Sequence, residues 1–235
     1  MSLIRPGTLA ALAAAYWAPS ASVIVPDAGS AFGIRTRLPG SAGVLLTFDD
    51  GPHPQATPAV LDILDKAAVK AVFFLVGEQV QRWPTLAAEI PAAGHTIGVH
   101  GFRHQSRRQW TARLLRDDLN RARSALHDAT GTTPRLYRPP HGLLTLAGLH
   151  EIRTQGLDLL LWSRWGRDWE RSATVESITR HLTDATEAGD ILLLHDADHY
   201  ASPGSWKITV AALPPILDEL ARKGLHPSPL AVPLL

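Results

Sequence analysis

Two adjacent carboxylates, Asp49 and Asp50, follow an apolar run and precede Gly51-Pro52 in the stretch TFDDGPHP. The apolar run predicts a buried parallel strand, along which successive side chains point to opposite faces. At the end of such a strand the two carboxylates would project in different directions and could do different chemistry. The alternative is a turn, because Asp-Gly is common in turns and Asp often caps a helix.

A second candidate is the histidine pair His100 and His104. The i, i+4 spacing places both imidazoles on one face of a helical turn, where they can bind one metal ion. The peptidase motif with this spacing has Glu directly after the first His, and this chain has Gly101, so a peptidase would lack its general base. One carboxylate from another strand end would complete a His2Asp set with positions open for water and substrate, as in catalytic zinc sites.

Composition limits the possible functions. The chain has 235 residues, is 45% hydrophobic and carries a net charge of +1, which fits one globular domain or, less simply, two small ones. Charges of both signs are interspersed, and the arginine-rich stretch 103–123 is typical of a solvated helix face, so we expect no nucleic-acid partner. The absence of cysteine excludes disulfides, Cys-bound zinc and a thiol nucleophile.

From residue 43 onward, short apolar runs alternate with longer amphipathic segments, without a repeat or a linker. This alternation predicts a parallel sheet, either open and doubly wound or closed into a barrel. The expected strands are 43–50, 71–77, 95–101, 135–142, 157–163 and 190–196. The expected helices are 58–69, 111–130, 144–155, 175–188 and 208–224.

Polar residues recur at the carboxyl ends of these strands, which favours a barrel whose strand ends meet at one mouth. An open doubly wound sheet that binds nucleotides would carry a glycine-rich phosphate loop, and neither GxGxxG nor GxxxxGK[ST] occurs in the chain. The strand-end residues are Asp49, Asp50, His100, Arg138, His141, Ser163, His195 and Asp196.

The amino-terminal segment permits two interpretations. No residue between Arg5 and Asp27 is charged, and a short apolar run ends near small residues around Ser20, which resembles a weak signal peptide. The run is rich in Ala and broken by Pro19, so it could equally be a helix and strand packed under the domain. We therefore expect residues 1–40 to be a signal-like or packed extension, and leave the compartment and membrane association open.

Five motifs occur in order: TFDDGP, the H-x-x-x-H pair, RPPHG, Asp168-Trp169, and L-x-H at 193–195. Together they resemble the polysaccharide deacetylases of carbohydrate esterase family 4, the NodB-like domains. The resemblance covers residues 43–224 and implies a catalytic domain over 41–235. It also implies a distorted, TIM-barrel-like (β/α) barrel of about seven parallel strands that hydrolyses acetyl groups on sugars with one divalent metal.

The resemblance assigns the metal to Asp50, His100 and His104, with zinc the first choice and cobalt the second. It makes Asp49 the general base, kept ionised and oriented by Arg138.

The resemblance makes His195 the general acid that protonates the leaving group, with Asp168 favouring its charged form. A backbone N–H near His141 would hold the oxyanion, while Trp169 and Leu193 would line a pocket for the acetyl methyl. Trp169 and Leu193 could instead be plain core residues.

Three departures from the family pattern are visible. Gly101 stands where Ser or Thr is usual, which removes a hydrogen bond that would steady the ligand loop. His141 occupies a place often held by Tyr. Ser163 and Arg164 lie where acidic residues are common, which affects substrate contacts more than catalysis.

We therefore expect a monomeric, metal-dependent hydrolase that removes acetyl groups from a carbohydrate polymer, with N-acetylglucosamine units the first choice. The alternative within the enzyme class is an O-acetyl esterase on xylan or another glycan. The alternative outside the enzymes is a non-catalytic glycan-binding barrel. A serine hydrolase is disfavoured because GxSxG is absent.

Overall fold

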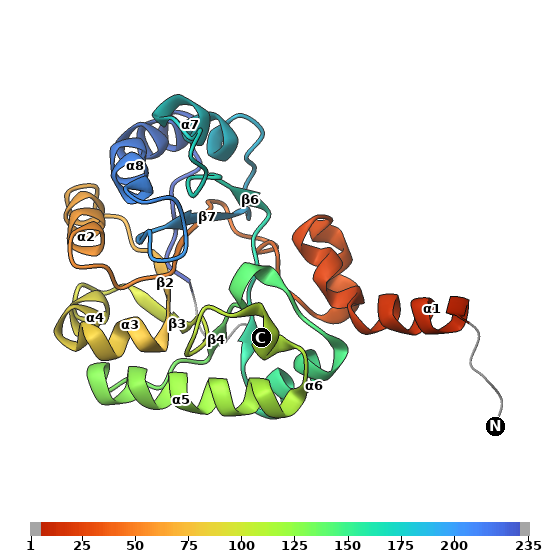
Figure 1. Cartoon of the computed structure of the whole chain (residues 1–235). Coiled ribbons are helices and arrows are strands. Elements are labelled where there is room, and N and C mark those ends of the chain that lie inside the picture. Colours follow the sequence, from red (N-terminus) through yellow and green to blue (C-terminus); the bar gives the residue numbers. More distant parts are fainter. Residues whose placement is uncertain (1–5, 231–235) are drawn as a thin grey trace, which may run out of the picture.

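The computed structural model describes residues 6–230 and contains one curled, seven-stranded parallel sheet (Figure 1). The strand order is β5-β4-β3-β2-β1-β7-β6, so the sheet forms a half-barrel with β5 and β6 at its two edges. The strands are β1 (Leu45–Asp49), β2 (Val72–Leu75), β3 (Thr96–Val99), β4 (Leu136–Tyr137), β5 (Asp158–Leu159), β6 (Arg164–Trp165) and β7 (Ile191–His195). The predicted barrel of about seven parallel strands is confirmed.

The central strands are apolar because the sheet is buried on both faces. Every residue of β1 and β2 is buried, and Phe48 of β1 stacks on Phe73 of β2 with ring centroids 5.0 Å apart. A parallel sheet covered on both sides requires such near-continuous hydrophobic runs. The register pairs Asp49 with His195 and with Phe74, which brings the carboxyl ends of β1, β2 and β7 to one edge.

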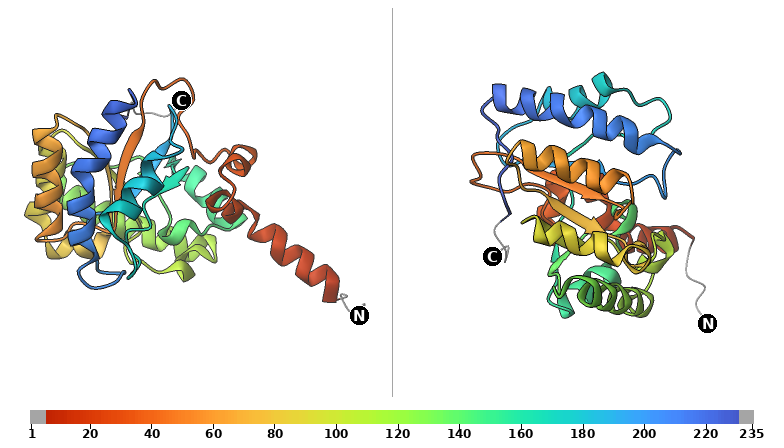
Figure 2. Two further views of the ribbon diagram at one scale, coloured as in Figure 1. Left: turned by 90° about the horizontal axis from the view of Figure 1, so that it is seen from above. Right: turned by 90° about the vertical axis from the view of Figure 1, so that its left-hand side faces the viewer.

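Helices cover the outside of the curled sheet (Figures 1 and 2). Local signals set their limits: Thr111 caps the longest helix by accepting a hydrogen bond from the Leu114 N–H, and Gly131 ends it in the left-handed conformation. The helices are α2 (Ala56–Lys66), α3 (Gly77–Arg82), α4 (Pro84–Ala92), α5 (Ala112–Thr130), α6 (Leu146–Thr154), α7 (Val175–Thr183) and α8 (Ser205–Arg222).

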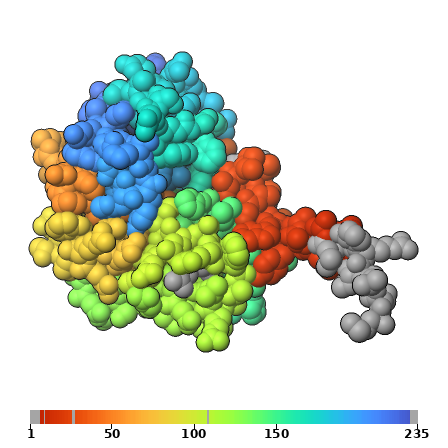
Figure 3. All heavy atoms as spheres, in the orientation of Figure 1, coloured from red at the N-terminus to blue at the C-terminus, as the bar shows by residue number. Residues whose placement is uncertain are grey.

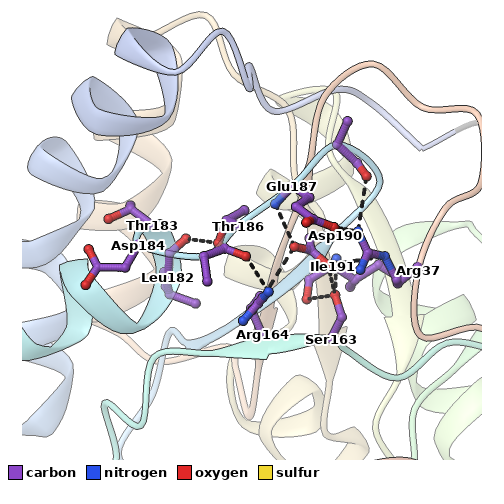
Figure 4. Close-up of polar contacts among 12 residues, drawn as sticks. Arg37, Ser163, Arg164, Leu182, Thr183, Asp184, Thr186, Glu187, Asp190 and Ile191 are labelled. Atoms are coloured by element: carbon purple, nitrogen blue, oxygen red, sulfur yellow. Dashed lines mark hydrogen bonds and ion pairs between the residues drawn. The ribbon is translucent and has the colours of Figure 1, made fainter. Parts of the chain in front are cut away.

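The predicted strand 157–163 is wrong as a single element. Its first residues form β5 at one edge of the sheet, and the chain then reaches the other edge, where β6 begins at Arg164. Ser163 therefore lies at the start of β6 and not at the end of a strand. Its hydroxyl donates to Asp190 Oδ1 at 2.7 Å (Figure 4).

Asp190 is fully buried and lies at the amino end of β7, opposite the carboxyl ends of the strands. Several polar side chains contact its carboxylate there. Arg164 Nε lies 3.3 Å from Asp190 Oδ2, and Arg37 Nε lies 3.4 Å from Asp190 Oδ1 (Figure 4). The buried carboxylate is therefore satisfied by charged and hydroxyl partners, as burial requires. Ser163 and Arg164 thus belong to a structural network, and the expectation that they bear on substrate contacts is corrected.

The amino-terminal segment comprises helix α1 (Pro6–Tyr16) and the 3-10 helices η1 (Ala18–Val23) and η2 (Pro26–Phe32). After η2, Arg35 pairs with Leu160 and Arg37 with Asp190, so this segment lies beside the edge strand β5 and beside the amino end of β7. Ser20 Oγ accepts from the Leu144 N–H at 2.8 Å, which fixes η1 against the domain. Helix α1 projects away from the body of the molecule (Figure 2). Within residues 6–230, no helix combines the length and the apolar composition needed to cross a membrane.

Candidate active site

The carboxyl ends of the strands surround a cavity of about 380 Å³. Asp49 and Asp50 come from the end of β1, and His195 comes from the end of β7. The structure thus brings together side chains from distant parts of the sequence, from Asp49 to Ala201. The lining residues are Asp49, Asp50, His100, His104, His141, Trp162, Trp165, Trp169, Leu193, His195, Tyr200 and Ala201.

Asp50, His100 and His104 form a compact cluster whose donor atoms all lie within 4.8 Å of one another. Asp50 Oδ1 lies 3.5 Å from His100 Nε2 and 3.3 Å from His104 Nε2. Ligand atoms that bind one zinc ion tetrahedrally at about 2.0–2.2 Å are themselves roughly 3.3–3.6 Å apart. Asp50 Oδ1 is buried and finds no hydrogen-bond partner among residues 6–230. The cluster therefore fits a single divalent ion.

Both histidines of the cluster are neutral, as metal ligands must be. Burial lowers the pKa of His100 well below its usual value, and burial with the nearby His100 lowers the pKa of His104 to about 2. His100 Nδ1 lies 2.8 Å from the carbonyl oxygen of Arg138. A carbonyl can only accept, so Nδ1 carries the proton and Nε2 directs its lone pair toward the centre of the cluster.

The backbone of Asp50 is in the left-handed region, with φ 79°, a conformation that is costly for a residue other than glycine. The next residue, Gly51, packs against Asp196, and a Cβ atom there would lie 2.4 Å from Asp196 Oδ2. Asp196 is buried, and its Oδ2 accepts from the Thr57 hydroxyl at 2.5 Å. The DDG sequence thus turns Asp50 away from the sheet toward the histidines, while Asp49 keeps the strand direction.

Tyr200 orients His104 and was not predicted from the sequence. The Tyr200 ring stacks on the His104 ring with centroids 4.4 Å apart and planes 16° apart. Its hydroxyl donates to Glu78 Oε1 at 2.8 Å and accepts from Gln79 Nε2 at 3.0 Å, so α3 holds the ring in place. Tyr200 follows the motif L-x-H by five residues in a loop, and no spacing rule relates it to the histidine pair.

The loop between the histidines is anchored although Gly101 lacks a hydroxyl group. Gly101 has φ +82°, where a side chain would be strained, and an added Cβ would lie 3.0 Å from Asp118 Oδ2. The same Asp118 oxygen accepts from the Phe102 N–H at 2.8 Å. Gly77 N–H also donates to the Gly101 carbonyl at 2.9 Å. Asp118 of α5 therefore supplies the steadying contact that the sequence analysis expected to be missing.

Asp49 does not share the role of Asp50. Arg138 Nη1 donates to Asp49 Oδ1 at 2.7 Å and to the Thr47 hydroxyl at 2.8 Å. The other guanidinium nitrogens donate to the carbonyl oxygens of Leu160 and Leu161, so this fully buried arginine is fixed from three sides. The second oxygen of Asp49, Oδ2, lies 3.7 Å from His100 Nε2 and faces the cluster.

Burial raises the pKa of Asp49, while the charges of Arg138 and His195 lower it. Arg138 acts in the expected direction, but desolvation has the larger effect on the pKa of Asp49. A divalent cation in the cluster would also lower the pKa of Asp49, as Arg138 does. A carboxylate with a raised pKa is a better proton acceptor near neutral pH than an ordinary one.

His195 lies on the other side of the cavity and pairs with buried Asp168. Its Nδ1 donates to Asp168 Oδ1 at 2.8 Å, and its own backbone N–H donates to Asp168 Oδ2 at 2.8 Å. The Thr209 hydroxyl of α8 completes the set with a 2.8 Å bond to Asp168 Oδ2. Although burial lowers it, the pKa of His195 is raised to about 10 by the charge and hydrogen bond of Asp168 and by Asp50 and Asp49. His195 is therefore a cation at neutral pH.

Three tryptophans form an apolar wall beside His195. Trp169 packs edge-on against His195 with ring centroids 5.3 Å apart, Trp165 follows at 6.0 Å from Trp169, and Trp162 at 5.9 Å from Trp165. Leu193 of β7 also lines the cavity. Trp169 and Leu193 were predicted from the sequence, whereas Trp162, at the end of the predicted strand 157–163, and Trp165, just beyond it, were not.

His141 lies at the mouth with a left-handed backbone, φ 57°. Its ring meets the His104 ring edge-on at 4.4 Å, and its side chain lines the cavity. Burial and the charge of His195 lower the pKa of His141, so this imidazole is neutral. The structure therefore places all ten residues of the sequence-based site around one cavity, with Arg138 and Asp168 directly behind its walls.

Comparisons with known proteins agree with this geometry. Residues 38–160 match the family model described as polysaccharide deacetylase. A peptidoglycan-N-acetylglucosamine deacetylase from Bacillus cereus is 37% identical over 184 residues, which cover 77% of this chain and 83% of that protein. A chitooligosaccharide deacetylase from Azorhizobium caulinodans is 30% identical over 196 residues, covering 80% of this chain and 93% of that protein.

The fold is also similar to a solved structure. The crystal structure of the Bc1960 peptidoglycan N-acetylglucosamine deacetylase superposes with a TM-score of 0.80 at 28% sequence identity, covering 91% of this chain and 95% of that one. The family match covers more than half of the chain, and the two sequence relatives match over most of their own length. The chain therefore belongs to the polysaccharide deacetylase family.

Proposed function

We propose that this protein removes the acetyl group from N-acetylglucosamine units of a glycan, with Asp49 as base and His195 as acid. The main support for the proposal is that an acidic side chain and a positively charged imidazole lie on opposite sides of one cavity. A carboxylate bound by Arg138 and a cationic imidazole bound by Asp168 flank the Asp50, His100 and His104 cluster. Hydrolysis of an amide needs a proton acceptor for water and a proton donor for the amine, and this site holds one of each.

The metal would be held by one oxygen of Asp50 and by the Nε2 atoms of His100 and His104. Two imidazoles and one carboxylate suit zinc, and cobalt is the second choice. Such an ion supplies Lewis-acid chemistry, because it acidifies water and polarises a carbonyl oxygen. The carbonyl of Arg138 orients His100 through Nδ1, and the Tyr200 ring orients His104.

Asp49 would take the proton from the attacking water through Oδ2, the oxygen that faces the cluster. Arg138 binds the opposite oxygen and thereby fixes the carboxylate plane. His195 would then give its Nε2 proton to the leaving nitrogen, since Nδ1 is engaged with Asp168. A pKa of about 10 keeps His195 protonated until the amine needs the proton.

The acetyl group would enter with its methyl toward Leu193 and the tryptophan wall, which is the apolar part of the cavity. A backbone N–H near His141 would stabilise the oxyanion of the tetrahedral intermediate, because a fixed dipole there needs no reorganisation during the reaction. His141 in place of the usual tyrosine would leave this backbone role intact and change the contacts to the sugar.

The names of the relatives support N-acetylglucosamine as the acetylated sugar, since the two described above act on peptidoglycan and on chitooligosaccharides. The test is acetate release from chitooligosaccharides, peptidoglycan and acetylated xylan, measured in parallel with zinc or cobalt added. We expect release from at least one of the two N-acetylglucosamine substrates. Release from xylan alone would make the protein an O-acetyl esterase, and release from none would support a non-catalytic glycan-binding barrel.

Replacing His195 by Ser should slow amide hydrolysis on the order of 10²–10⁴-fold, the usual contribution of a positioned acid. The loss on an activated aryl acetate should be far smaller, because a phenolate leaves without protonation. The measurement is kcat on both substrates, with Trp206→Phe, a nearby aromatic change in α8, as the folding control. An equal loss on the two substrates would show that His195 is not the acid.

A further inference from the structure

Large apolar side chains are exposed on the amino-terminal segment and on the parts of the domain that follow its contacts. Leu12 of α1 is 59% exposed, and Ile24 and Val25, which follow η1, are 82% and 53% exposed. Trp110, Leu114 and Leu146 of the adjoining domain are 56%, 37% and 42% exposed. Monomeric soluble proteins rarely gather so much apolar surface in one place without a function.

These six residues belong to segments that contact one another. The Tyr16 hydroxyl at the end of α1 donates to the Trp110 carbonyl oxygen at 2.5 Å. Ser20 of η1 hydrogen-bonds the backbone of Leu144, two residues before Leu146. Of the seven large hydrophobic side chains that are exposed in the described part of the chain, only Trp83 lies elsewhere. We call α1 with these flanking residues the apolar face.

Helix α1 itself has no polar side. Its sequence, PGTLAALAAAY, contains no charged residue, and its described residues from Gly7 to Ala15 are exposed. It projects from the domain, and among residues 6–230 no other element lies against it along most of its length (Figures 1 and 3). A helix that is apolar all round requires apolar surroundings on every side. A second copy of the chain would cover one stripe of it and leave the rest in water.

The segment next to the apolar face is rich in arginine, although Arg116 at its end is paired with Glu151. From Phe102 to Arg116 the sequence has five arginines and no acidic residue. The side chains of Arg103, Arg107 and Arg113 are exposed beside Trp110 and Leu114 in the chain. Exposed arginines beside an apolar surface attract the headgroups of anionic lipids.

We propose that the apolar face docks on an anionic lipid bilayer, with α1 inserted into one leaflet. Its 11 residues span ~16 Å, about half of the ~30 Å hydrocarbon core, and the charged Arg5 directly precedes them in the sequence, so α1 would lie along one leaflet and not enter it end-on. Tyr16, Trp17 and Trp110 lie together at the base of the helix, where aromatic side chains favour the boundary between lipid and water.

Docking in this way places the mouth of the cavity near the lipid surface. Val23 of η1 packs against Gly142, so close that a Cβ atom on this glycine would lie 2.5 Å from Val23 Cγ2. Gly142 directly follows His141, which lines the cavity. The segment that would bind the membrane therefore packs directly against the residues at the mouth of the cavity. A glycan polymer close to the bilayer would lie within reach of the cavity. The proposal about lipid does not depend on which glycan is the substrate.

The test is co-sedimentation of the full chain with vesicles of phosphatidylcholine, with or without phosphatidylglycerol. We expect binding that is stronger with phosphatidylglycerol and that weakens as salt is raised. The double variant Leu12→Asp, Ile24→Asp should lower the partition coefficient about tenfold or more, because it places two charges in the apolar face. Trp83→Ser, which removes the exposed tryptophan outside this face, should bind like the unaltered protein.

Far-UV circular dichroism and thermal unfolding check that both variants fold, and their deacetylation of a soluble chitooligosaccharide should be unchanged. The proposal is overturned if the full chain stays in the supernatant with both vesicle types, or if the double variant binds as well as the unaltered chain. It is also overturned if sedimentation equilibrium shows a dimer that the double variant abolishes without vesicles, since a second copy would then cover the face. Isolation from cells of a mature chain that begins beyond Tyr16 would likewise exclude it.

Discussion

Asp49→Asn is expected to lower kcat for acetate release on the order of 10²–10⁴-fold while leaving metal binding nearly unchanged. The amide is almost isosteric with the carboxylate, so it fills the same space beside Arg138 and still accepts a hydrogen bond. It cannot take a proton from water, however, and Asp49 Oδ2 is the oxygen that faces the metal cluster. Turnover and zinc affinity, measured on the same preparation, check this expectation.

Asp50→Ala is the matched comparison, because it removes the neighbouring carboxylate from the same turn. This variant should bind zinc more weakly, since one of three protein ligands is lost, and excess zinc should restore part of its activity. Added zinc should not rescue Asp49→Asn. Equal loss of zinc affinity in the two variants would mean that both carboxylates bind the metal. Wild-type turnover in Asp49→Asn would show that Asp49 is not the general base.

The fold could be predicted from sequence because a parallel sheet that is buried on both faces leaves a plain signature. Runs such as LLTFD and ILLLH are mostly apolar and end in polar residues. The carboxyl ends of parallel strands meet at one edge, so each polar end could be placed at the same mouth without knowledge of distances. For this reason Asp49, Asp50, His100 and His195 were located correctly.

The edge strands could not be predicted in the same way. The segment 157–163 is apolar like a central strand, but only Asp158 and Leu159 pair with β4. What decides the path is a tertiary contact, because Arg35 pairs with Leu160 and Asp190 binds Ser163 and Arg164. Neither contact leaves a local periodicity, so Ser163 was assigned to the wrong end of the barrel.

Residues that hold the metal-ligand histidines in position were also not predicted from the sequence. Tyr200 orients His104 through a stacked ring, and Asp118 holds the histidine loop through the Phe102 N–H. A metal ligand can be recognised by its residue type and spacing, whereas a supporting side chain can come from any element that reaches it. The missing hydroxyl at Gly101 could be seen in the sequence, but its replacement by Asp118 became visible only in the structure.

The most direct measurement is a titration of metal-free protein with zinc while acetate release from a chitooligosaccharide is followed. Chelation should abolish activity and leave the far-UV circular dichroism spectrum unchanged, because the apolar core of the sheet does not involve Asp50, His100 or His104. Activity should then rise in proportion to added zinc and level off at one equivalent per chain, since the cavity offers one cluster of three ligands. Full activity in the metal-free protein, or no activity with zinc or cobalt on any acetylated glycan, would contradict the account.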